Sequence, residues 1–445
     1  MKNIKNTLKE IARYPSAIIG SIIILLLIVS SIVVVIKIPY NEAIRLWRGG
    51  EEVWYQNPKF AAPIWVNWFR EKKLPVSFAV LTANGSMEKK VIAGAQNTSS
   101  IIVKHSFDFQ SDVPPQEILL YFDAKYTQKQ PFVSVVWVTP DGRQIRVDDF
   151  GVAQKQTVRF SQDQKLIVRL KTDKPMDALF TDPKTKQILK GKYELQIIGT
   201  TFEAGSDFDV QFISHGLVFG WAGTDHARRD LALPLMWGTP IALIFGLVAS
   251  LGTLLLTMII AAIGTWYGGW VDALIQRITE VNLVLPFLSI LVMVGTFYSR
   301  SIWVILGVTV LLSIFTGSIK SYRAIFMQVK ESGYIEAARA YGASDFRIIF
   351  SYLIPRMIPL LIPGLVSSVP AYVFLEASLA VLGLGDPVLP TWGKIINDAE
   401  MNGALYKGYY YWILEPAVLL MITGFGFAML GFALDRVFNP RLRDI

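Results

Sequence analysis

Residues 17–36 read AIIGSIIILLLIVSSIVVVI, a run of 20 residues without a charge. A helix of about 20 apolar residues is long enough to cross the hydrocarbon core of a bilayer. A secretory signal peptide is the alternative, but its apolar run is usually about 7–15 residues and a small-residue cleavage site follows it. This run is longer and no such site follows, so we expect a membrane anchor.

The composition agrees with a membrane protein. Of 445 residues, 52% are hydrophobic and 18% are charged, and the mean hydropathy is +0.41, which is more apolar than ordinary soluble chains. The lack of cysteine excludes disulfides, thiol nucleophiles and cysteine metal sites. His105, His215 and His226 are too scattered to predict a metal site. The net charge of +8 would suit nucleic acid, but basic residues cluster beside apolar runs, so we expect a membrane role.

Five further uncharged runs are long enough to span a bilayer. They are Leu231–Val271, Val281–Ser299, Ser301–Ile319, Met357–Leu375 and Pro416–Leu434. The first could hold one span, such as Thr239–Thr265, with residues to spare. Together with Ala17–Ile36 they predict six transmembrane helices. We therefore expect an all-α polytopic core that contacts the lipid bilayer and binds no nucleic acid.

Basic residues predict the orientation, because cytoplasmic loops carry an excess of Lys and Arg. They gather in the N-terminal tail, after the fourth span and in the C-terminal tail, at Lys2, Lys5, Lys9, Arg13, Lys320, Arg323, Lys330, Arg339, Arg347, Arg356, Arg436, Arg441 and Arg443. Six spans place all three regions on one side. We therefore expect a multi-pass protein of the cell membrane with both termini in the cytoplasm and residues of about 37–230 outside.

The segment 37–220 has the pattern of strands. Two groups of apolar residues alternate with polar neighbours and should each share a strand face: Tyr193, Leu195 and Ile197, and Leu166, Val168 and Leu170. Phe132–Val138 is apolar on both faces, as in a central strand, and Thr139–Gly142 is a turn signal. We expect an extracytoplasmic, mainly-β, sandwich-like domain. The tryptophan-rich stretch 41–70 is expected at the membrane surface.

The chain thus divides into a tail and first span (1–36), the insertion (37–220) and a five-helix membrane core (221–445). Asn97-Thr98-Ser99 in the insertion matches the glycosylation acceptor, although the motif is short and common.

No catalytic site is expected. Asp148-Asp149 is a tempting pair of carboxylates, but neighbours on a strand point to opposite faces, and a solvated turn is the simpler interpretation. Gly191-Lys192 and Gly393-Lys394 lack the spacing of a phosphate-binding loop. The chain is therefore expected to be no enzyme, to hold no cofactor or metal, and to rely on another subunit for any ATP.

A charged, alanine-rich loop lies between the fourth and fifth spans. A helical stripe of Ile335, Ala338 and Tyr341 should end at Gly342, after which Ser344 can cap a second helix and Asp345 suits its positive end. The second apolar stripe comprises Phe346, Ile349, Phe350 and Leu353, and Pro355 should close it. Two interpretations remain open: a helix on the bilayer surface, or a knob that fits a partner's groove.

The spacing Glu336-Ala337-Ala338, three residues, Gly342 and then Pro355 resembles the EAA loop of ABC importer permeases. Ile354 stands where that pattern usually has Leu. The resemblance implies a type I importer fold, in which this loop (within 320–356) is a coupling helix that docks into a cytoplasmic ATPase. It assigns coupling roles to Glu336, Ala337, Ala338, Gly342, Ser344, Asp345 and Phe346. ATP and Mg would be bound by the ATPase subunits.

Other stretches resemble the dipeptide, oligopeptide and nickel branch, in the C-type subunit. They are Gly223-Thr224-Asp225 with Arg229-Asp230, Tyr267–Asp272, Glu376–Leu379 with Gly383–Gly385, Pro390–Gly393, and Asn439–Arg443. Arg228 replaces a glycine of the family, so the local turn is expected to differ. The resemblance does not cover 41–215.

The fifth span carries the candidates for the translocation path. Pro355, Pro359 and Pro363 are spaced by four and favour kinks, which suits either a packed, bent helix or a helix that lines the path. Glu376 follows at the outer end, where a carboxylate needs water or a partner. We take Pro359, Pro363 and Glu376 as path candidates. Gly246, Ser250 and Gly252 should allow close helix packing.

The resemblance implies a permease subunit of an ATP-driven importer that works by alternating access. Its partners would be a homologous second permease, two ABC ATPases and an extracytoplasmic solute-binding protein. Peptides are the expected substrate, with nickel or oligosaccharides as alternatives. A membrane sensor with an outer ligand domain and a self-sufficient secondary transporter are more distant alternatives. The insertion would either dock or partly replace the binding protein, or cover the partner permease.

Overall fold

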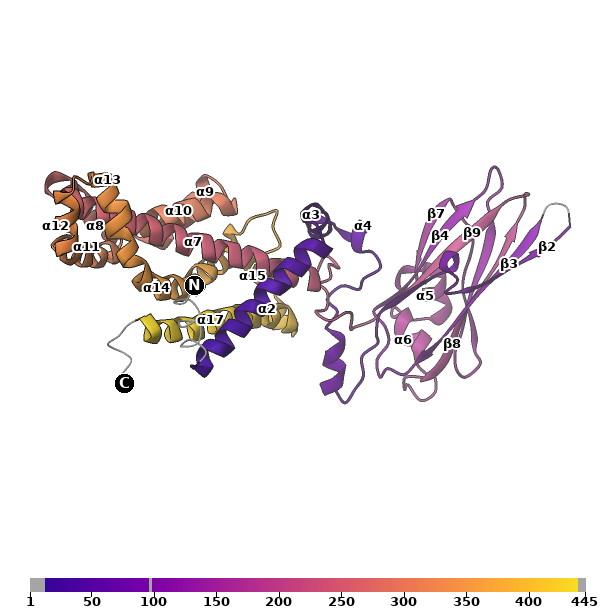
Figure 1. The fold of residues 1–445 in the computed structure, drawn as a ribbon. Helices are drawn as coiled ribbons and strands as arrows, with labels where there is room; N and C mark the ends of the chain where they lie inside the picture. Colours follow the sequence, from indigo (N-terminus) through magenta and orange to yellow (C-terminus); the bar gives the residue numbers. More distant parts are fainter. Residues whose placement is uncertain (1–12, 96–97, 439–445) are drawn as a thin grey trace. The chain divides into compact units, whose positions relative to one another are not determined.

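The computed structural model describes residues 13–95 and 98–438. The basic residues Lys2, Lys5, Lys9, Arg441 and Arg443, the tail motif from Asn439 and the acceptor Asn97 lie outside these residues. The chain forms two compact units (Figure 1): one holds the described residues up to Arg48 and from Leu233 onward, the other is Gly49–Ala232. Both divisions fall 12 residues later than the expected boundaries after 36 and 220.

The first unit is helical. Its helices are α2 (Pro15–Lys37), α3 (Tyr40–Arg48), α7 (Ala232–Tyr267), α8 (Gly269–Val284), α9 (Phe287–Phe297), α10 (Ile302–Ile314), α11 (Gly317–Lys330), α12 (Gly333–Ala340), α13 (Asp345–Ile348), α14 (Ile354–Leu379), α15 (Trp392–Met401), α16 (Ala404–Lys407) and α17 (Tyr411–Phe438). Within residues 13–95 and 98–438, four helices are long and apolar enough to cross a membrane, or up to six spans result if α8 with α9 and α10 with α11 each form one bent span. Each expected apolar run overlaps one of these.

The two bent pairs differ in how sharply they turn. The axes of α8 and α9 meet at 79°, across a break at Leu285 and Pro286. The axes of α10 and α11 meet at 49°, and the last carbonyl groups of α10 there find side-chain donors. Asn282 Nδ2 lies 2.9 Å from Leu312 O and 2.7 Å from Phe315 O, and Thr257 Oγ1 lies 3.1 Å from Ile314 O. These bonds satisfy backbone oxygens that the interrupted helix leaves open.

Small residues set the closest helix contacts. A Cβ on Gly20 of α2 would lie 2.6 Å from the carbonyl oxygen of Gly426 in α17. A Cβ on Gly246 of α7 would lie 2.7 Å from Val373 of α14, and Ser250 Oγ donates to Leu365 O at 2.8 Å. The expected close packing at Gly246 and Ser250 is thus confirmed.

Helix α14 runs without a break through Pro359, Pro363 and Pro370. The expectation that Pro355 closes the preceding helix is wrong. A π-helical turn (Ile349–Leu353) joins α13 to α14, and Pro355 stands in the first turn of α14. Proline fits there because the wider π turn and the first helical turn do not need its missing N–H.

The chain leaves the helical unit after α3 and returns to it at α7 beside the same place. Trp237 Nε1 of α7 donates to Ile38 O at 3.2 Å. The rings of Trp237 and Tyr40 meet edge to face with centroids 6.1 Å apart. These contacts clasp the two ends of the helical unit between which the second unit is inserted.

The second unit is an antiparallel β-sandwich, as expected. One sheet has the order β1 (Phe78–Leu81), β9 (Asp207–His215), β4 (Glu117–Lys125) and β7 (Lys155–Arg159). The other has the order β2 (Glu88–Ala93), β3 (Ser99–Phe109), β8 (Gly191–Thr201), β5 (Phe132–Val138) and β6 (Gln144–Gly151). Alternate residues of both sheets form one core, including Trp137, Tyr193 and Phe212. The expected shared face of Tyr193, Leu195 and Ile197 is buried, and β5 is an internal strand.

Short helices complete this unit. They are α4 (Glu51–Trp54), α5 (Gln164–Leu170), α6 (Pro175–Phe180), and the 3-10 turns η1 (Ile64–Phe69), η2 (Thr82–Asn84) and η3 (Phe160–Gln162). The strand expected at Leu166, Val168 and Leu170 is wrong: these residues belong to α5. Asp163 caps that helix by accepting from Leu166 N at 2.8 Å, and Lys171 ends it in a left-handed conformation. The alternation was misleading, because Leu166 is buried whereas Val168 is 73% exposed.

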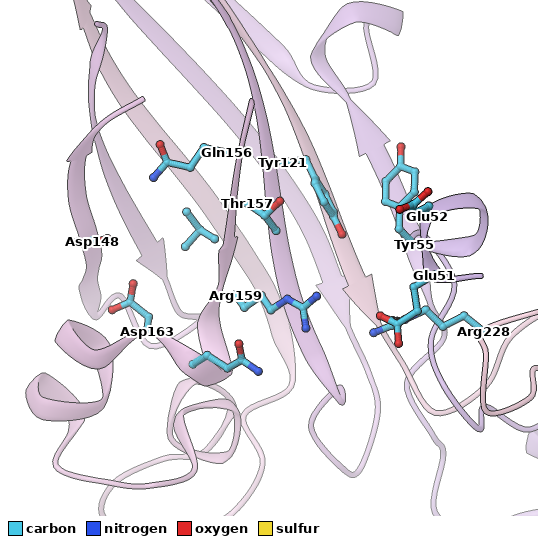
Figure 2. Close-up of a pocket in the computed structure, with 12 residues that line it drawn as sticks. Glu51, Glu52, Tyr55, Tyr121, Asp148, Gln156, Thr157, Arg159, Asp163 and Arg228 are labelled. Atoms are coloured by element: carbon cyan, nitrogen blue, oxygen red, sulfur yellow. Dashed lines mark ion pairs between the residues drawn. The ribbon is translucent and has the colours of Figure 1, made fainter. Parts of the chain in front are cut away.

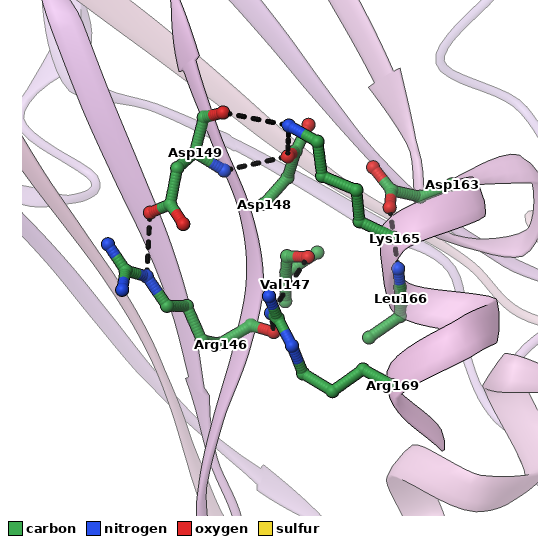
Figure 3. Close-up of polar contacts among 8 residues, drawn as sticks. All are labelled: Arg146, Val147, Asp148, Asp149, Asp163, Lys165, Leu166 and Arg169. Atoms are coloured by element: carbon green, nitrogen blue, oxygen red, sulfur yellow. Dashed lines mark hydrogen bonds and ion pairs between the residues drawn. The ribbon is translucent and has the colours of Figure 1, made fainter. Parts of the chain in front are cut away.

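Asp148 and Asp149 also differ from expectation, because they lie within β6 and not in a turn. The register against β5 shifts between Val135 and Val136, so β6 carries a bulge at this point. Each carboxylate has a cationic partner: Asp148 pairs with Lys165 at 2.6 Å and Asp149 with Arg146 at 2.7 Å (Figure 3). Both carboxylates are therefore held in ion pairs within the β-rich unit.

In the turn Gly223–Asp230, Arg228 adopts a backbone conformation that glycine usually occupies. Arg228 has φ +65, in the left-handed region. Its guanidinium is buried, where NH1 donates to Asn57 O at 2.7 Å and contacts His215 Nδ1 at 3.2 Å. The turn therefore keeps a left-handed backbone, and the side chain bonds to the interior of the β-rich unit.

We predict that Gly20→Leu destabilises the helical unit, because its Cβ would overlap the backbone of α17. Overpacking of this kind costs about 1–3 kcal/mol, so the melting temperature of the chain in detergent should fall by several degrees. Gly307→Leu in α10 is the control, since a Cβ there meets nothing within 4 Å. Equal melting temperatures for the two variants would contradict the proposed contact.

His215 gives the β-rich unit a pH dependence. Burial, with the nearby guanidinium of Arg228, lowers the pKa of His215 from 6.5 to about 4. Its neutral ring donates from Nε2 to Tyr55 O at 3.1 Å and accepts from Arg228 at Nδ1. The unfolded chain takes up the proton first, so this stability is complete above pH 6.5 and about 3 kcal/mol of it is lost by pH 4.

This loss of unfolding free energy at low pH can be measured by urea unfolding of the full chain in micelles at several pH values. Because the chain has no cysteine, Val135→Cys provides a single buried reporter that reacts with a dithiodipyridine reagent only on unfolding. His215→Gln should flatten the stability curve between pH 6.5 and 4, whereas the half-buried His105→Gln should leave most of the slope. An unchanged slope in His215→Gln would exclude this origin.

Candidate ATPase-coupling site

Helix α12 presents two different faces. Ile335 and Ala338 are buried, in one apolar cluster with residues of α7, α11 and α14. Glu336 and Ala337 lie on the exposed face. The expected stripe extends no further, because Tyr341 is 91% exposed. Helix α12 is therefore packed against α7, α11 and α14 on one face, and its opposite face is accessible to a partner.

Gly342 ends α12 in a Schellman motif. Its φ is +78, its N–H donates to Arg339 O at 2.9 Å, and the N–H of Ala343 donates to Ala338 O at 3.0 Å. A side chain at Gly342 would strain this left-handed backbone. The predicted helix stop is confirmed in its mechanism as well as its position.

Ser344 caps α13, as expected, by accepting from Arg347 N at 3.4 Å. The expected apolar stripe is only half right, however. Ile349 and Leu353 are buried, but Phe346 is 69% exposed and its ring lies 4.5 Å from that of Phe350, which is also exposed. The π turn that follows α13 shifts the helical period, so Ile348 takes an inner place instead.

The structure thus brings the seven predicted coupling residues into one continuous segment. Six are exposed: Glu336, Ala337, Gly342, Ser344, Asp345 and Phe346. Ala338 is the exception, since it is buried and anchors the helix. Exposed aromatic rings are enriched at protein interfaces, so Tyr341, Phe346 and Phe350 make this a surface that suits a protein partner.

Cationic side chains fasten this segment to the end of α7. The guanidinium carbon of Arg339 lies 4.3 Å from the centroid of the Trp266 ring, and Lys330 Nζ lies 5.6 Å from it. Lys330 Nζ also donates to Thr265 O at 2.9 Å and to Trp266 O at 3.0 Å. The last carbonyls of α7 are thereby satisfied by a cation, which also suits the helix dipole.

A second link lies nearby. Arg323 of α11 binds both carboxylate oxygens of Asp272 in α8, at 2.7 and 2.5 Å. Figure 1 shows α8, α11, α12 and α13 gathered at one end of the helical unit. We did not predict Trp266, Lys330 or Asp272 as site residues. The available signals were the place of Lys330 in a basic loop and the place of Asp272 in the Tyr267–Asp272 stretch that resembles the family.

The predicted path residues do not form one site. Pro359 is exposed and Pro363 is buried. Glu376 is 13 residues beyond Pro363, or about 20 Å along a helix. Its carboxylate is buried and has Thr391 as its hydrogen-bond partner, so it reaches a partner within the chain. Among the described residues, no group of three or more His, Asp or Glu side chains could hold a metal.

Comparison with known proteins agrees with this geometry. A family model described as the inner membrane component of binding-protein-dependent transport systems matches residues 254–444, which include α12, Gly342 and α13. The dipeptide transport system permease protein DppC of Bacillus subtilis is 30% identical over 224 residues, covering 50% of this chain and 69% of the relative. The chain belongs to this permease family.

Two other relatives extend the comparison. The oligopeptide permease protein OppC of Bacillus subtilis is 29% identical over 229 residues, covering 50% of this permease and 72% of the relative. The glutathione permease protein GsiD of Pectobacterium atrosepticum is 26% identical over 247 residues, covering 55% and 80%. The β-rich unit of this permease, Gly49–Ala232, lies outside the residues that the family model matches.

We predict that Arg339→Gln loosens the coupling segment, because it removes the cation from the Trp266 ring. Such contacts contribute about 0.5–1 kcal/mol at exposed sites, so amide hydrogen exchange in α12 should accelerate about two- to fivefold. Arg347→Gln is the matched control: it removes the same charge from an exposed arginine of α13. If both variants exchange at the same rate, the ring contact does not hold the helix.

Proposed function

We propose that this permease is the membrane subunit of an ATP-driven importer of peptides. The observation that carries the proposal is the exposed segment Glu336–Phe346, held rigidly on the end of α7, in a chain whose relatives include DppC and OppC. Two bent helix pairs count as spans in this proposal, which gives six spans with both termini in the cytoplasm. The β-rich unit would then face the outside of the cell.

The remaining subunits would supply what this chain lacks. Two cytoplasmic ATPases bind ATP and Mg and contact α12 and α13 through Phe346, Phe350 and the exposed face of α12. A homologous second permease completes the pathway, and a solute-binding protein delivers the substrate. The permease itself is a transport subunit and hydrolyses nothing.

The contacts of the coupling segment suggest how force passes into the membrane. When the ATPases close, they displace α12, and the Trp266 contact with Arg339 and Lys330 carries that displacement into α7. Helix α7 packs on α14 at Gly246 and Ser250, so the two helices move together. Because packed helices shift between discrete arrangements, such a displacement switches the access of the pathway.

Peptides are the substrate class that the relatives favour. The names of DppC, OppC and GsiD refer to dipeptides, oligopeptides and glutathione, all of which contain peptide bonds. Nickel and oligosaccharides are the alternatives. Uptake assays with a labelled peptide, with nickel and with an oligosaccharide would separate the three.

A test of coupling uses the reconstituted complex. We predict that Glu336→Arg, Gly342→Leu and Phe346→Ala each reduce substrate-stimulated ATPase activity and peptide uptake at least tenfold, because each alters the surface offered to the ATPase. The protein should still reach the membrane in normal amount. Tyr406→Ala in α16 is the control, since Tyr406 is 98% exposed but lies outside the coupling segment. Normal stimulation in the three variants would refute the proposed contact.

A further inference from the structure

Two edge strands of the sandwich, β6 and β7, differ in whether side chains cover their free backbone groups. Strand β6 ends the five-stranded sheet and β7, which follows it in the chain, ends the four-stranded sheet. An edge strand carries a row of unpaired N–H and C=O groups, so proteins usually cover or disrupt it. Side chains cover the free edge of β6, whereas the free edge of β7 is left uncovered by the described residues.

The edge of β6 is covered by α5. Lys165 Nζ lies 3.0 Å from Asp149 O and 2.6 Å from Asp148 Oδ1. Arg169 donates to the carbonyl oxygens of Arg146 and Val147. Figure 3 shows both cations reaching from α5 to this strand. Cations thus occupy the carbonyl groups that a further strand would need.

The edge of β7 faces a cavity. Among the described strands β7 pairs with β4 alone, and the bond from Ala124 N to Gln154 O (2.9 Å) fixes which residues point toward β4. By the alternation of an antiparallel ladder, Lys155, Thr157 and Arg159 turn their N–H and C=O groups the other way. Residues 156–159 line a cavity of about 570 Å³ (Figure 2), which is within the usual size of a small-ligand site.

Two arginines meet at one end of this cavity, where Glu51 and Glu52 also line the wall. Arg228 approaches it from the turn before α7, and Arg159 approaches it from β7; Figure 2 shows the two guanidinium groups pointing toward one another. Arg228 is already bonded to Asn57 O and lies 3.8 Å from Glu51. Within the described residues, Arg159 has no carboxylate within 4 Å. An incoming carboxylate is the group that Arg159 lacks.

The other walls are polar and aromatic. The rings of Tyr55 and Tyr121 meet edge to face at 4.9 Å. Asp148 and Asp163 lie across from them, but Asp148 is paired with Lys165 and Asp163 caps α5. Glu51 is paired with Lys59 and Arg228, whereas Glu52 and Arg159 have no ion-pair partner within the described residues. The β7 edge, the Arg159 guanidinium and the Glu52 carboxylate are therefore the groups of this cavity that a ligand finds unengaged.

We propose that this cavity binds a short extended peptide, which adds to β7 as a further strand and sets its terminal carboxylate beside Arg159. The alternating N–H and C=O groups of Thr157 and Arg159 match a peptide backbone, as in other strand-addition sites. A small anion would engage the arginine and leave the edge unused. The inference concerns the β-rich unit alone and does not rest on transport, because binding can be measured without the ATPases.

The experiment uses the full chain in detergent micelles and a fluorescently labelled tetrapeptide of alanine and valine, followed by fluorescence anisotropy. The free-acid peptide should bind about tenfold more tightly than its C-terminal amide. Arg159→Gln should weaken binding of the acid about tenfold and remove the difference between acid and amide. Lys155→Gln is the matched control: it removes one charge from the same strand, at a residue that does not line the cavity.

Strand addition is tested separately by N-methylation of the peptide at successive residues. Methyl groups should abolish binding at alternate positions only, because only alternate N–H groups face β7. The proposal is overturned if no peptide binds, if acid and amide bind equally, if every methylated peptide binds, or if inorganic phosphate displaces the peptide at its own site with equal affinity. Melting curves of Arg159→Gln, an exposed residue, establish that the variant is folded.

Discussion

A peptide group inside a bilayer finds no water, so each backbone N–H and C=O must be satisfied by the protein itself. This constraint explains why the longest apolar segments of the helical unit are helices and why a bend between two apolar helices needs other hydrogen-bond donors. The break after α10 is the informative case. Asn282 and Thr257 supply donors to three carbonyl oxygens that the helix leaves open. The bend between α10 and α11 is tolerated because neighbouring helices replace the hydrogen bonds that bending removes.

The same constraint favours irregular backbone at the ends of the helices. Outside the hydrocarbon, a glycine in a left-handed turn, a π turn and exposed aromatic rings carry no such penalty. The stretch from α12 through the π turn after α13 combines all three, and it remains attached to α7, where Arg339 and Lys330 contact the Trp266 ring. The coupling role proposed for this segment would use this combination of a surface open to a partner and a side-chain attachment to α7.

Apolar runs predicted the long apolar helices well, since each run overlaps a helix or a bent pair of helices that is apolar enough to cross a membrane. A charge within hydrocarbon is costly, so such runs have clear limits. Gly342 and Ser344 were also predictable, since a helix stop and an N-cap depend on local backbone chemistry. The outer domain was harder. Leu166, Val168 and Leu170 alternate like a strand, but Asp163 caps a helix there and a seven-residue element is too short for periodicity to decide. The Trp266 contact depends on residues more than sixty positions apart, which a single sequence cannot pair.

The clasp between Tyr40, Ile38 and Trp237 changes how the inserted unit should be regarded. To the helical unit, Gly49–Ala232 is a loop whose ends are already held together. The entropy of closing a loop rises only with the logarithm of its length, by about 0.6 kcal/mol for each doubling. A connection as long as Gly49–Ala232 therefore costs only about 2–3 kcal/mol more to close than one of about ten residues. In evolutionary terms the clasp makes the interval between α3 and α7 a permissive site for insertion, where a domain can be gained, exchanged or lost while the membrane core is preserved.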